Sequence, residues 1–314
     1  KAINDSVKYA NERKQFCVLI STFGAIKHKL AQQVIKTFAA ESAVYRVSKD
    51  IDDQIELNKA AGFDKGRATI EGIAHYAVEA AILKVYGSES LDFVIDEAVQ
   101  IHGGMGYSAE MDVERGYRDS RINRIFEGTN EINRLLIADT AIKRAQKGEF
   151  DLFGPAAELY AGLDKITCGC KEGESYYEEK RRYLANFKKT ALLIIHGAAT
   201  HFDKKLVREQ EVMNNISEMI MEIYVAESLA LRTEKLETLK PADLYRDMLD
   251  VYVYDAAEII RKSALDAANS FAAGEEADKL RNAIDELTWV KGVNVKEARR
   301  RIADKLIEDN AYKF

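Results

Sequence analysis

One acidic residue stands where helix formation does not require it. In RIFEGTNEINR, residues 124–134, Glu127 precedes Gly128 and lies two residues before Thr129, the predicted N-cap of the next helix. The helix dipole favours an acid inside the first turn rather than ahead of it. Against an apolar pocket beside Phe126, desolvation would raise the pKa of this carboxylate toward the range of a general base, and Gly128 would leave room for a substrate. The alternative is a solvated loop acid.

A glycine pair offers bare backbone to a ligand. In AVQIHGGMGY, residues 98–107, a predicted helix ends at Gly103 and Gly104. Backbone without side chains lets a flat or phosphorylated molecule approach closely, and Gln100 adds amide hydrogen bonds. Taken alone, the pattern also fits a helix C-terminus followed by a flexible loop.

Two polar side chains at the end of the first predicted helix can bind a phosphate. In ERKQF, residues 12–16, Arg13 offers a bidentate fork and Gln15 an amide. The alternative is a charged helix end with Phe16 in the core. Thr129 and the N–H groups after it can likewise cap a helix or hold a polar cofactor. Four charged residues before the EGT stretch also fit surface ion pairs of little energetic value, namely Arg118, Asp119, Arg121 and Arg124.

Long helices must position these residues. Helix formers abound, only two prolines occur, and no Asn-Gly or Asp-Gly hairpin signal is present, so we predict an all-α protein. One expected helix stops at Gly87, the residue type preferred just after a helix end. In the first half we expect helices over residues 1–12, 23–50, 67–86, 89–102 and 130–147, which together form a bundle. The apolar stripe of the last of these helices is predicted to be Ile132, Leu135, Leu136 and Ile142.

A stretch with two glycines and a proline, QKGEFDLFGP at 146–155, breaks the helical pattern and predicts a linker. We therefore expect a helical bundle over residues 1–148, truncated at its start, and a second helical domain over 152–314. The second domain is expected to stabilise the assembly and to do no chemistry. Its helices are predicted at 176–202, 206–235, 242–273, 276–289 and 295–307. Because the chain opens on an amphipathic stretch without a preceding cap, we expect it to begin inside a larger protein.

The composition excludes several classes of protein. The chain has 314 residues, 47% of them hydrophobic, and a net charge of −6, so it has ample core and lacks the basic face that nucleic-acid binding needs. No apolar run approaches the roughly 18–20 residues of a bilayer span. The histidines form no HExxH pattern, and we expect no metal site. Cys17, Cys168 and Cys170 fit unpaired thiols in a reducing compartment, because Cys-Gly-Cys is too tight for ordinary zinc-ligand spacing.

Three motifs together resemble the C-terminal helical domain of the acyl-CoA dehydrogenases. YANERKQF, EAVQIHGGMGY and YRDSRINRIFEGTNEINR occur in the family's order, and the 27-residue spacing from Gln100 to Glu127 also matches. Any one motif could arise by chance, but three in register are specific. The resemblance covers residues 1–147 well. The remainder resembles, in architecture more than in motif, the extra C-terminal domain of the very-long-chain branch.

The resemblance implies an FAD-dependent oxidoreductase of fatty-acid β-oxidation that converts acyl-CoA thioesters to trans-2-enoyl-CoA. By matching position, Glu127 would be the catalytic base that removes the α-proton, and Gly128 would meet the substrate. The β-hydrogen would leave as hydride to a flavin bound mainly by another subunit. The implied FAD-binding residues are Arg13, Gln15, Phe23, Gly24, Gln100, Ile101, His102, Gly103, Gly104, Thr129, Asn130 and Glu131.

Two positions depart from the family pattern. Cys17 stands where a glycine is usual, and Phe23-Gly24 stands where Phe-Gln or His-Gln is common, so the FAD contact of that glutamine is lost. The family's N-terminal helical domain and middle β-domain have no counterpart in this sequence. We therefore expect a C-terminal fragment that is inactive and free of flavin when alone.

The resemblance also implies partners: an acyl-CoA substrate, electron-transfer flavoprotein as electron acceptor, and a second copy in a homo-oligomer, either dimer or tetramer. Membrane contact is not expected, because no helix combines a strongly basic face with an aromatic-rich one. The expected location is the cytoplasm in a bacterium, or the mitochondrial matrix or inner-membrane face in a eukaryote. Two other classes stay open. One is a non-catalytic helical scaffold or assembly module, and the other is a relative that acts on a nitroalkane or a damaged base.

Overall fold

The computed structural model describes all residues, 1–314, and confirms an all-α protein. It has twelve α-helices, namely α1 (Ala2–Glu12), α2 (Gly24–Ala60), α3 (Lys65–His75), α4 (Ala77–His102), α5 (Asp112–Arg121), α6 (Asn130–Gln146), α7 (Phe153–Ala161), α8 (Tyr176–Phe202), α9 (Gln210–Glu237), α10 (Asp243–Ala268), α11 (Gly274–Thr288) and α12 (Val295–Asp309). A short antiparallel hairpin, β1 (Lys14–Gln15) and β2 (Val18–Leu19), was not predicted. No helix is both long and apolar enough to cross a bilayer.

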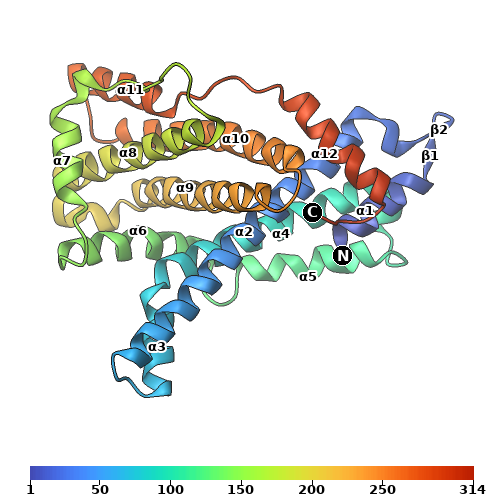
Figure 1. Ribbon diagram of the computed structural model, residues 1–314, viewed down its shortest axis with the longest axis horizontal. Helices are drawn as coiled ribbons and strands as arrows, with labels where there is room; N and C mark the ends of the chain where they lie inside the picture. The colour runs from blue at the N-terminus through green and yellow to red at the C-terminus, as the bar shows by residue number, and fades with distance from the viewer.

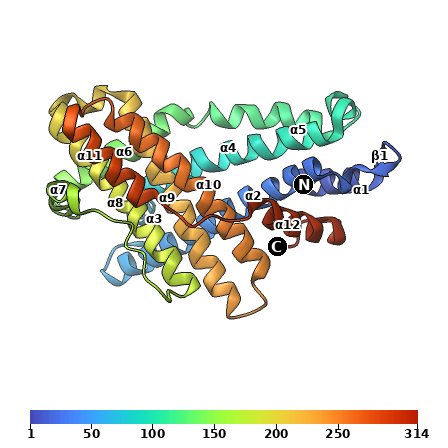
Figure 2. The same ribbon diagram turned by 90° about the horizontal axis from the view of Figure 1, so that it is seen from above.

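The helices form two groups along the long axis of the molecule (Figure 1). Helices α7 to α11 gather at one end, while α1, α5 and the hairpin lie at the other, near both termini. Helix α12 packs on α2 and α10 and also contacts α1 (Figure 2). The side chain of Asn11 donates to the Ile307 carbonyl at 3.0 Å, and the Tyr312 N–H donates to Asn4 Oδ1 at 2.7 Å. The end of the chain is thereby fastened to its beginning.

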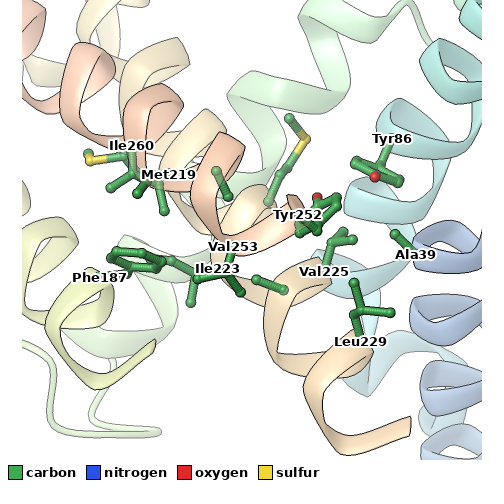
Figure 3. Close-up of a cluster of buried hydrophobic side chains, with 14 of the residues drawn as sticks. Ala39, Tyr86, Phe187, Met219, Ile223, Val225, Leu229, Tyr252, Val253 and Ile260 are labelled. Atoms are coloured by element: carbon green, nitrogen blue, oxygen red, sulfur yellow. The ribbon is translucent and has the colours of Figure 1, made fainter. Parts of the chain in front are cut away.

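One continuous core joins the two stretches that the sequence predicts as separate domains. A single cluster of 58 buried residues includes members of both. Figure 3 shows part of it, with Ala39 on α2 and Tyr86 on α4 facing Val225 on α9 and Tyr252 on α10. The division near residue 150 stays a prediction, since the two stretches share this core.

Helix α4 runs through Gly87, so the predicted helix stop there is wrong. The break falls earlier, at Tyr76, which leaves helical geometry with φ −98° and ψ 31°. Tyr86 and Ser88 are buried on either side of the glycine. Their packing outweighs the penalty of roughly 1 kcal/mol for a glycine inside a helix. Helix α2 likewise continues to Ala60, well past its predicted end.

The predicted apolar stripe of α6 is partly wrong. Ile132 is 58% exposed and Leu136 is 39% exposed, whereas Ile137, Ala138 and Ile142 are buried. The buried face is therefore rotated from the predicted one. As a result, large apolar side chains stand on the surface at the start of α6, next to the EGT stretch.

Candidate active site

Glu127 lies on a left-handed turn just before α6. Its φ is 56°, and Gly128 follows with a φ of 81°. A non-glycine residue adopts this conformation only where its surroundings impose it. Asn133 supplies that constraint, because its Nδ2 donates to the Gly128 carbonyl at 2.9 Å and to the Thr129 carbonyl at 3.1 Å. The backbone therefore holds the Glu127 carboxylate ahead of the helix and apart from its first turn.

The first turn of α6 has its own acid and cap. The Thr129 hydroxyl accepts a hydrogen bond from the Ile132 N–H at 3.3 Å. A hydrogen bond from its own backbone N–H lowers the pKa of Glu131, and the Thr129 hydroxyl lowers it further. Glu131 thus does what an acid in the first helical turn ordinarily does. Glu127, by contrast, makes no hydrogen bond or ion pair within the chain.

Asn130 is buried, and its side chain is fully used inside the protein. Its Nδ2 donates to Ser88 Oγ and to Glu89 Oε1, both at 3.0 Å. Its Oδ1 accepts from Lys84 Nζ at 2.7 Å and from Ser88 Oγ at 3.2 Å. Both N–H donors of its amide are engaged, and its oxygen accepts mainly from Lys84, because the single Ser88 hydroxyl proton is also within reach of the Val85 carbonyl. Asn130 is one of the residues predicted to bind the cofactor, but only its backbone is free to do so.

Exposed apolar side chains flank Glu127 along the chain. Ile122 and Ile125 are each 48% exposed, Phe126 is 47% exposed, and Ile132 is 58% exposed. We call these four residues the apolar rim. Glu127 is itself exposed, so this chain alone does not desolvate the carboxylate. A molecule laid on the rim would remove water from the carboxylate and from the rim together.

Seven of the predicted cofactor-binding residues line one groove of about 540 Å³ between α1, the hairpin, the start of α2 and the end of α4. They are Arg13, Gln15, Phe23, Ile101, His102, Gly103 and Gly104. The groove also includes five residues not predicted for it, Tyr9, Phe16, Ile20, Ile26 and Met105. Their contribution depends on how the hairpin folds back over α1, which no local motif reveals.

The glycine pair leaves open space above the backbone. Gly103 ends α4 with φ 59° and ψ −141°, a conformation that glycine adopts readily. A Cβ added to Gly103 or Gly104 would meet no atom within 4 Å. Gly106 has a different role, since its Cβ would lie 2.5 Å from the Val99 carbonyl oxygen. Gly103 and Gly104 therefore leave the backbone accessible to a ligand, whereas Gly106 allows close packing against α4.

One wall of the groove is a stacked pair of rings. The rings of His102 and Tyr9 lie 4.2 Å apart, centroid to centroid, at 27°. His102 Nδ1 is 2.7 Å from the Ala98 carbonyl oxygen. Nδ1 therefore carries a proton, and Nε2 is left for another partner. Phe16 is 89% exposed, so the alternative that places it in the core is wrong.

The other predicted site residues lie outside this groove. Gln100 is exposed on α4 but does not line the groove. Gly24 opens α2 and borders a separate groove of about 240 Å³ shared with α12. A Cβ at Gly24 would lie 3.7 Å from Arg300 Nη2, so an arginine of α12 stands beside the missing side chain. Glu127 and Thr129 lie outside both grooves, on the turn just before α6.

Arg134 fixes α6 between α4 and α9, a role that no local sequence motif predicts. Its guanidinium donates to Glu89 at 2.6 and 2.9 Å and to Glu218 at 3.0 and 3.1 Å. Burial lowers the pKa of Arg134, but Glu89 and Glu218 together raise it well above its ordinary value. The Ser217 hydroxyl also donates to the Arg134 carbonyl. The helix that begins at the EGT stretch is therefore held from both sides.

Comparison with known proteins agrees with this arrangement. Two models described as acyl-CoA dehydrogenase, C-terminal domain, match residues 1–142 and 186–288. A probable acyl-CoA dehydrogenase of Bacillus subtilis (strain 168) is 38% identical over 318 residues, covering 99% of this chain and 53% of that protein. The mitochondrial very long-chain specific acyl-CoA dehydrogenase of Bos taurus is 30% identical over 280 residues, covering 83% of this chain and 40% of that protein.

A solved structure matches the whole chain. It is the crystal structure of an acyl-CoA dehydrogenase complexed with FAD from Bacillus anthracis, which has a TM-score of 0.92 and 36% identity. The match covers 100% of this chain and 53% of that one, so the chain spans about half the length of such relatives. With the motifs, the fold and both family models in agreement, the chain belongs to the acyl-CoA dehydrogenase family.

Proposed function

We propose that this chain is the C-terminal half of an FAD-dependent acyl-CoA dehydrogenase and that Glu127 is its catalytic base. The reaction is the oxidation of an acyl-CoA thioester to the trans-2-enoyl-CoA, as in fatty-acid β-oxidation. One observation carries the proposal. Glu127 is an unpaired carboxylate on a left-handed turn, in a stretch of chain whose exposed apolar residues form the apolar rim. A surface acid with a purely structural role needs neither the turn nor the rim.

The rim explains how a carboxylate can remove a weakly acidic proton. An acyl chain that covers Ile125 and Phe126 excludes water from Glu127, which makes the carboxylate a stronger base. Gly128 carries no side chain that would block the α-carbon. The fixed turn keeps the carboxylate in position before the substrate arrives, so little reorganisation is needed at the moment of proton transfer.

The groove fits a dinucleotide. Its glycines leave backbone open, its walls are apolar and aromatic, and neither Arg13 nor Gln15 has an ion-pair or side-chain partner. Arg13 and Gln15 would hold the FAD pyrophosphate, and Gly103 and Gly104 would let the cofactor approach the backbone. When bound, FAD supplies the acceptor for the hydride that leaves the β-carbon.

The groove lies between α1, the hairpin, α2 and α4, whereas Glu127 stands on the turn before α6, and we infer that the two sites of different subunits combine. On this proposal the working enzyme is a homo-oligomer, and each flavin is bound mainly by the other copy. Electron-transfer flavoprotein is the proposed acceptor of the electrons. Alone, the 314 residues would not turn over substrate, because they enclose neither the carboxylate nor a complete flavin site.

The test is Glu127→Gln in the full-length enzyme. The variant should retain FAD and acyl-CoA but lose α-proton exchange by about three orders of magnitude, within the range that general bases contribute. Exchange is followed by NMR in deuterated water, which reports proton removal without turnover. Glu110→Gln is the matched control, because Glu110 is an exposed acid in the same half of the chain with no role in the proposed site, and it should keep exchange. Near-normal exchange in Glu127→Gln, or an equal loss in Glu110→Gln, would disprove the assignment.

A further inference from the structure

Two thiols outside the proposed site lie against each other. Cys168 and Cys170 are both free and stand in the connection between the 3-10 turn Leu163–Lys165 and α8. Their Sγ atoms are 2.8 Å apart, closer than unbonded sulfur atoms normally approach and longer than the roughly 2.05 Å of a disulfide. Cys170 is exposed, and Cys168 is half-buried. A small reagent can therefore reach the pair from solvent.

Tertiary contacts hold the backbone of Cys168 on both sides. The Cys168 N–H donates to Glu286 on α11 at 2.8 Å. Its carbonyl accepts from Asn186 Nδ2 at 2.8 Å and from Arg182 Nη1 at 3.3 Å, both on α8. Gly169 then reverses the chain with a φ of 65°, which brings the second thiol over the first. Cys168 is thus anchored on both sides, and the turn at Gly169 places Cys170 beside it.

The surroundings favour redox chemistry over metal binding. No group of three or more histidine, cysteine or carboxylate side chains is placed to hold a metal ion anywhere in the chain. Ordinary structural zinc sites need four ligands. Burial and the contact with Cys168 raise the pKa of the Cys170 thiol. A raised pKa leaves less Cys170 thiolate at neutral pH, while the proximity of the two thiols favours the closing step.

We propose that Cys168 and Cys170 form a reversible disulfide by exchange with low-molecular-weight disulfides of the glutathione type. One cysteine thiolate attacks a sulfur of the reagent, which forms a mixed disulfide and releases one reagent thiol. The other cysteine then displaces the second reagent thiol and closes the intramolecular bond. The two cysteines lose two electrons and two protons, and the reagent disulfide gains both as two thiols. The connection between α7 and α8 is thus a modification site.

Trypsin makes the pair easy to follow. It cleaves after Lys165 and Lys171, so the peptide ITCGCK carries both thiols. Native protein is equilibrated at pH 8 with known ratios of reduced to oxidised glutathione, quenched with acid, alkylated and digested. The disulfide form of the peptide lacks two hydrogens and takes up no alkyl group. Cys17 lies on another peptide and has no neighbouring thiol, so it should form only a mixed disulfide with glutathione.

The expected result is an equilibrium constant for disulfide formation roughly tenfold above that of the free synthetic peptide ITCGCK. A factor of this size corresponds to the conformational entropy lost when the backbone of about one residue is fixed. In the folded protein the backbone of Gly169 is already fixed. Asn186→Ala removes one anchor of Cys168 and should bring the constant toward that of the peptide. In Cys170→Ser, Cys168 should accumulate as the mixed disulfide.

Three results would overturn the proposal. The first is an equal constant in protein and peptide, which would show that the fold contributes nothing. The second is a stable glutathione adduct on Cys168 or Cys170 in place of the two-hydrogen loss. The third is co-purified zinc or copper that blocks alkylation until a chelator is added, which would make the pair a metal site.

Discussion

We predict that Glu222→Gln stabilises the protein much more at pH 8 than at pH 5. Glu222 lies on α9 and is only 7% exposed. Its Oε2 accepts a 2.8 Å hydrogen bond from Tyr252 on α10. Figure 3 shows Tyr252 and Tyr86 close together, where α4 meets the second group of helices. The protonation of Glu222 therefore affects the stability of the packing between α4 and the second group of helices.

Burial is the main cause that raises the pKa of Glu222 to about 7, from an ordinary value of 4.5. The bond from Tyr252 and the charge of Lys36 lower this pKa, while Glu218 and Asp255 raise it. The folded protein therefore binds a proton that the unfolded chain releases. This stabilisation is complete below about pH 4.5 and is lost as pH rises to about 7. A difference of roughly 2.5 pKa units corresponds to about 3 kcal/mol.

Glutamine keeps an oxygen that accepts from Tyr252, but it does not titrate. Urea unfolding followed by circular dichroism measures the effect. With a denaturant slope of about 3 kcal/mol per molar, the midpoint of Glu222→Gln should rise by roughly 1 M at pH 8 but only by roughly 0.3 M at pH 5. Glu211→Gln, an exposed acid on the same helix, should show no such pH dependence. If Glu222→Gln shifts the midpoint equally at both pH values, the carboxylate is not protonated in the folded state.

Three further predictions follow from single positions. Cys17→Gly should stabilise the protein by about 0.5–1 kcal/mol, because φ 67° costs a side chain more than glycine's added chain entropy; a lower melting temperature would contradict this. Gly103→Val should reduce the flavin content of the full-length enzyme at unchanged helical signal, and Gly104→Ala should reduce it less; full occupancy in Gly103→Val would exclude the role. Arg134→Met should lower the free energy of unfolding by about 2 kcal/mol, since it leaves Glu89 and Glu218 without a counter-charge. A loss near zero would show that these ion pairs contribute nothing to stability.

The features that the sequence predicts well depend on local residues. Gly103 and Gly104 end a helix wherever they occur in such a pattern, and the structure ends α4 there. The range predicted for α8 matches the observed Tyr176–Phe202, because Ser175 and Glu178 form a capping box at its start. The placement of Glu127 ahead of its helix likewise follows from the Gly-Thr that comes after it.

The features that the sequence predicts poorly depend on contacts between distant segments. Gly87 looks like a helix end, but tertiary packing keeps α4 intact. Asn130 stands in a motif and looks free to bind, yet Lys84 and Ser88 occupy its oxygen. Arg134 resembles an ordinary helix charge until α4 and α9 are placed on either side of it. Each of these outcomes requires knowing which helices meet, and one sequence does not supply that.

The second group of helices is therefore more than a support for the first. Helix α6 begins at the Glu127 turn, and one turn further along Arg134 joins it to Glu218 on α9. The Ser217 hydroxyl, also on α9, donates to the Arg134 carbonyl. On the other side, Asn130 and Arg134 tie the helix to α4 through Glu89. Removing α9 would take Glu218 away from the half-buried Arg134 and would expose the face of α6 that packs on α9. The position of the Glu127 carboxylate, and with it the proposed chemistry, thus depends on residues that themselves touch no substrate.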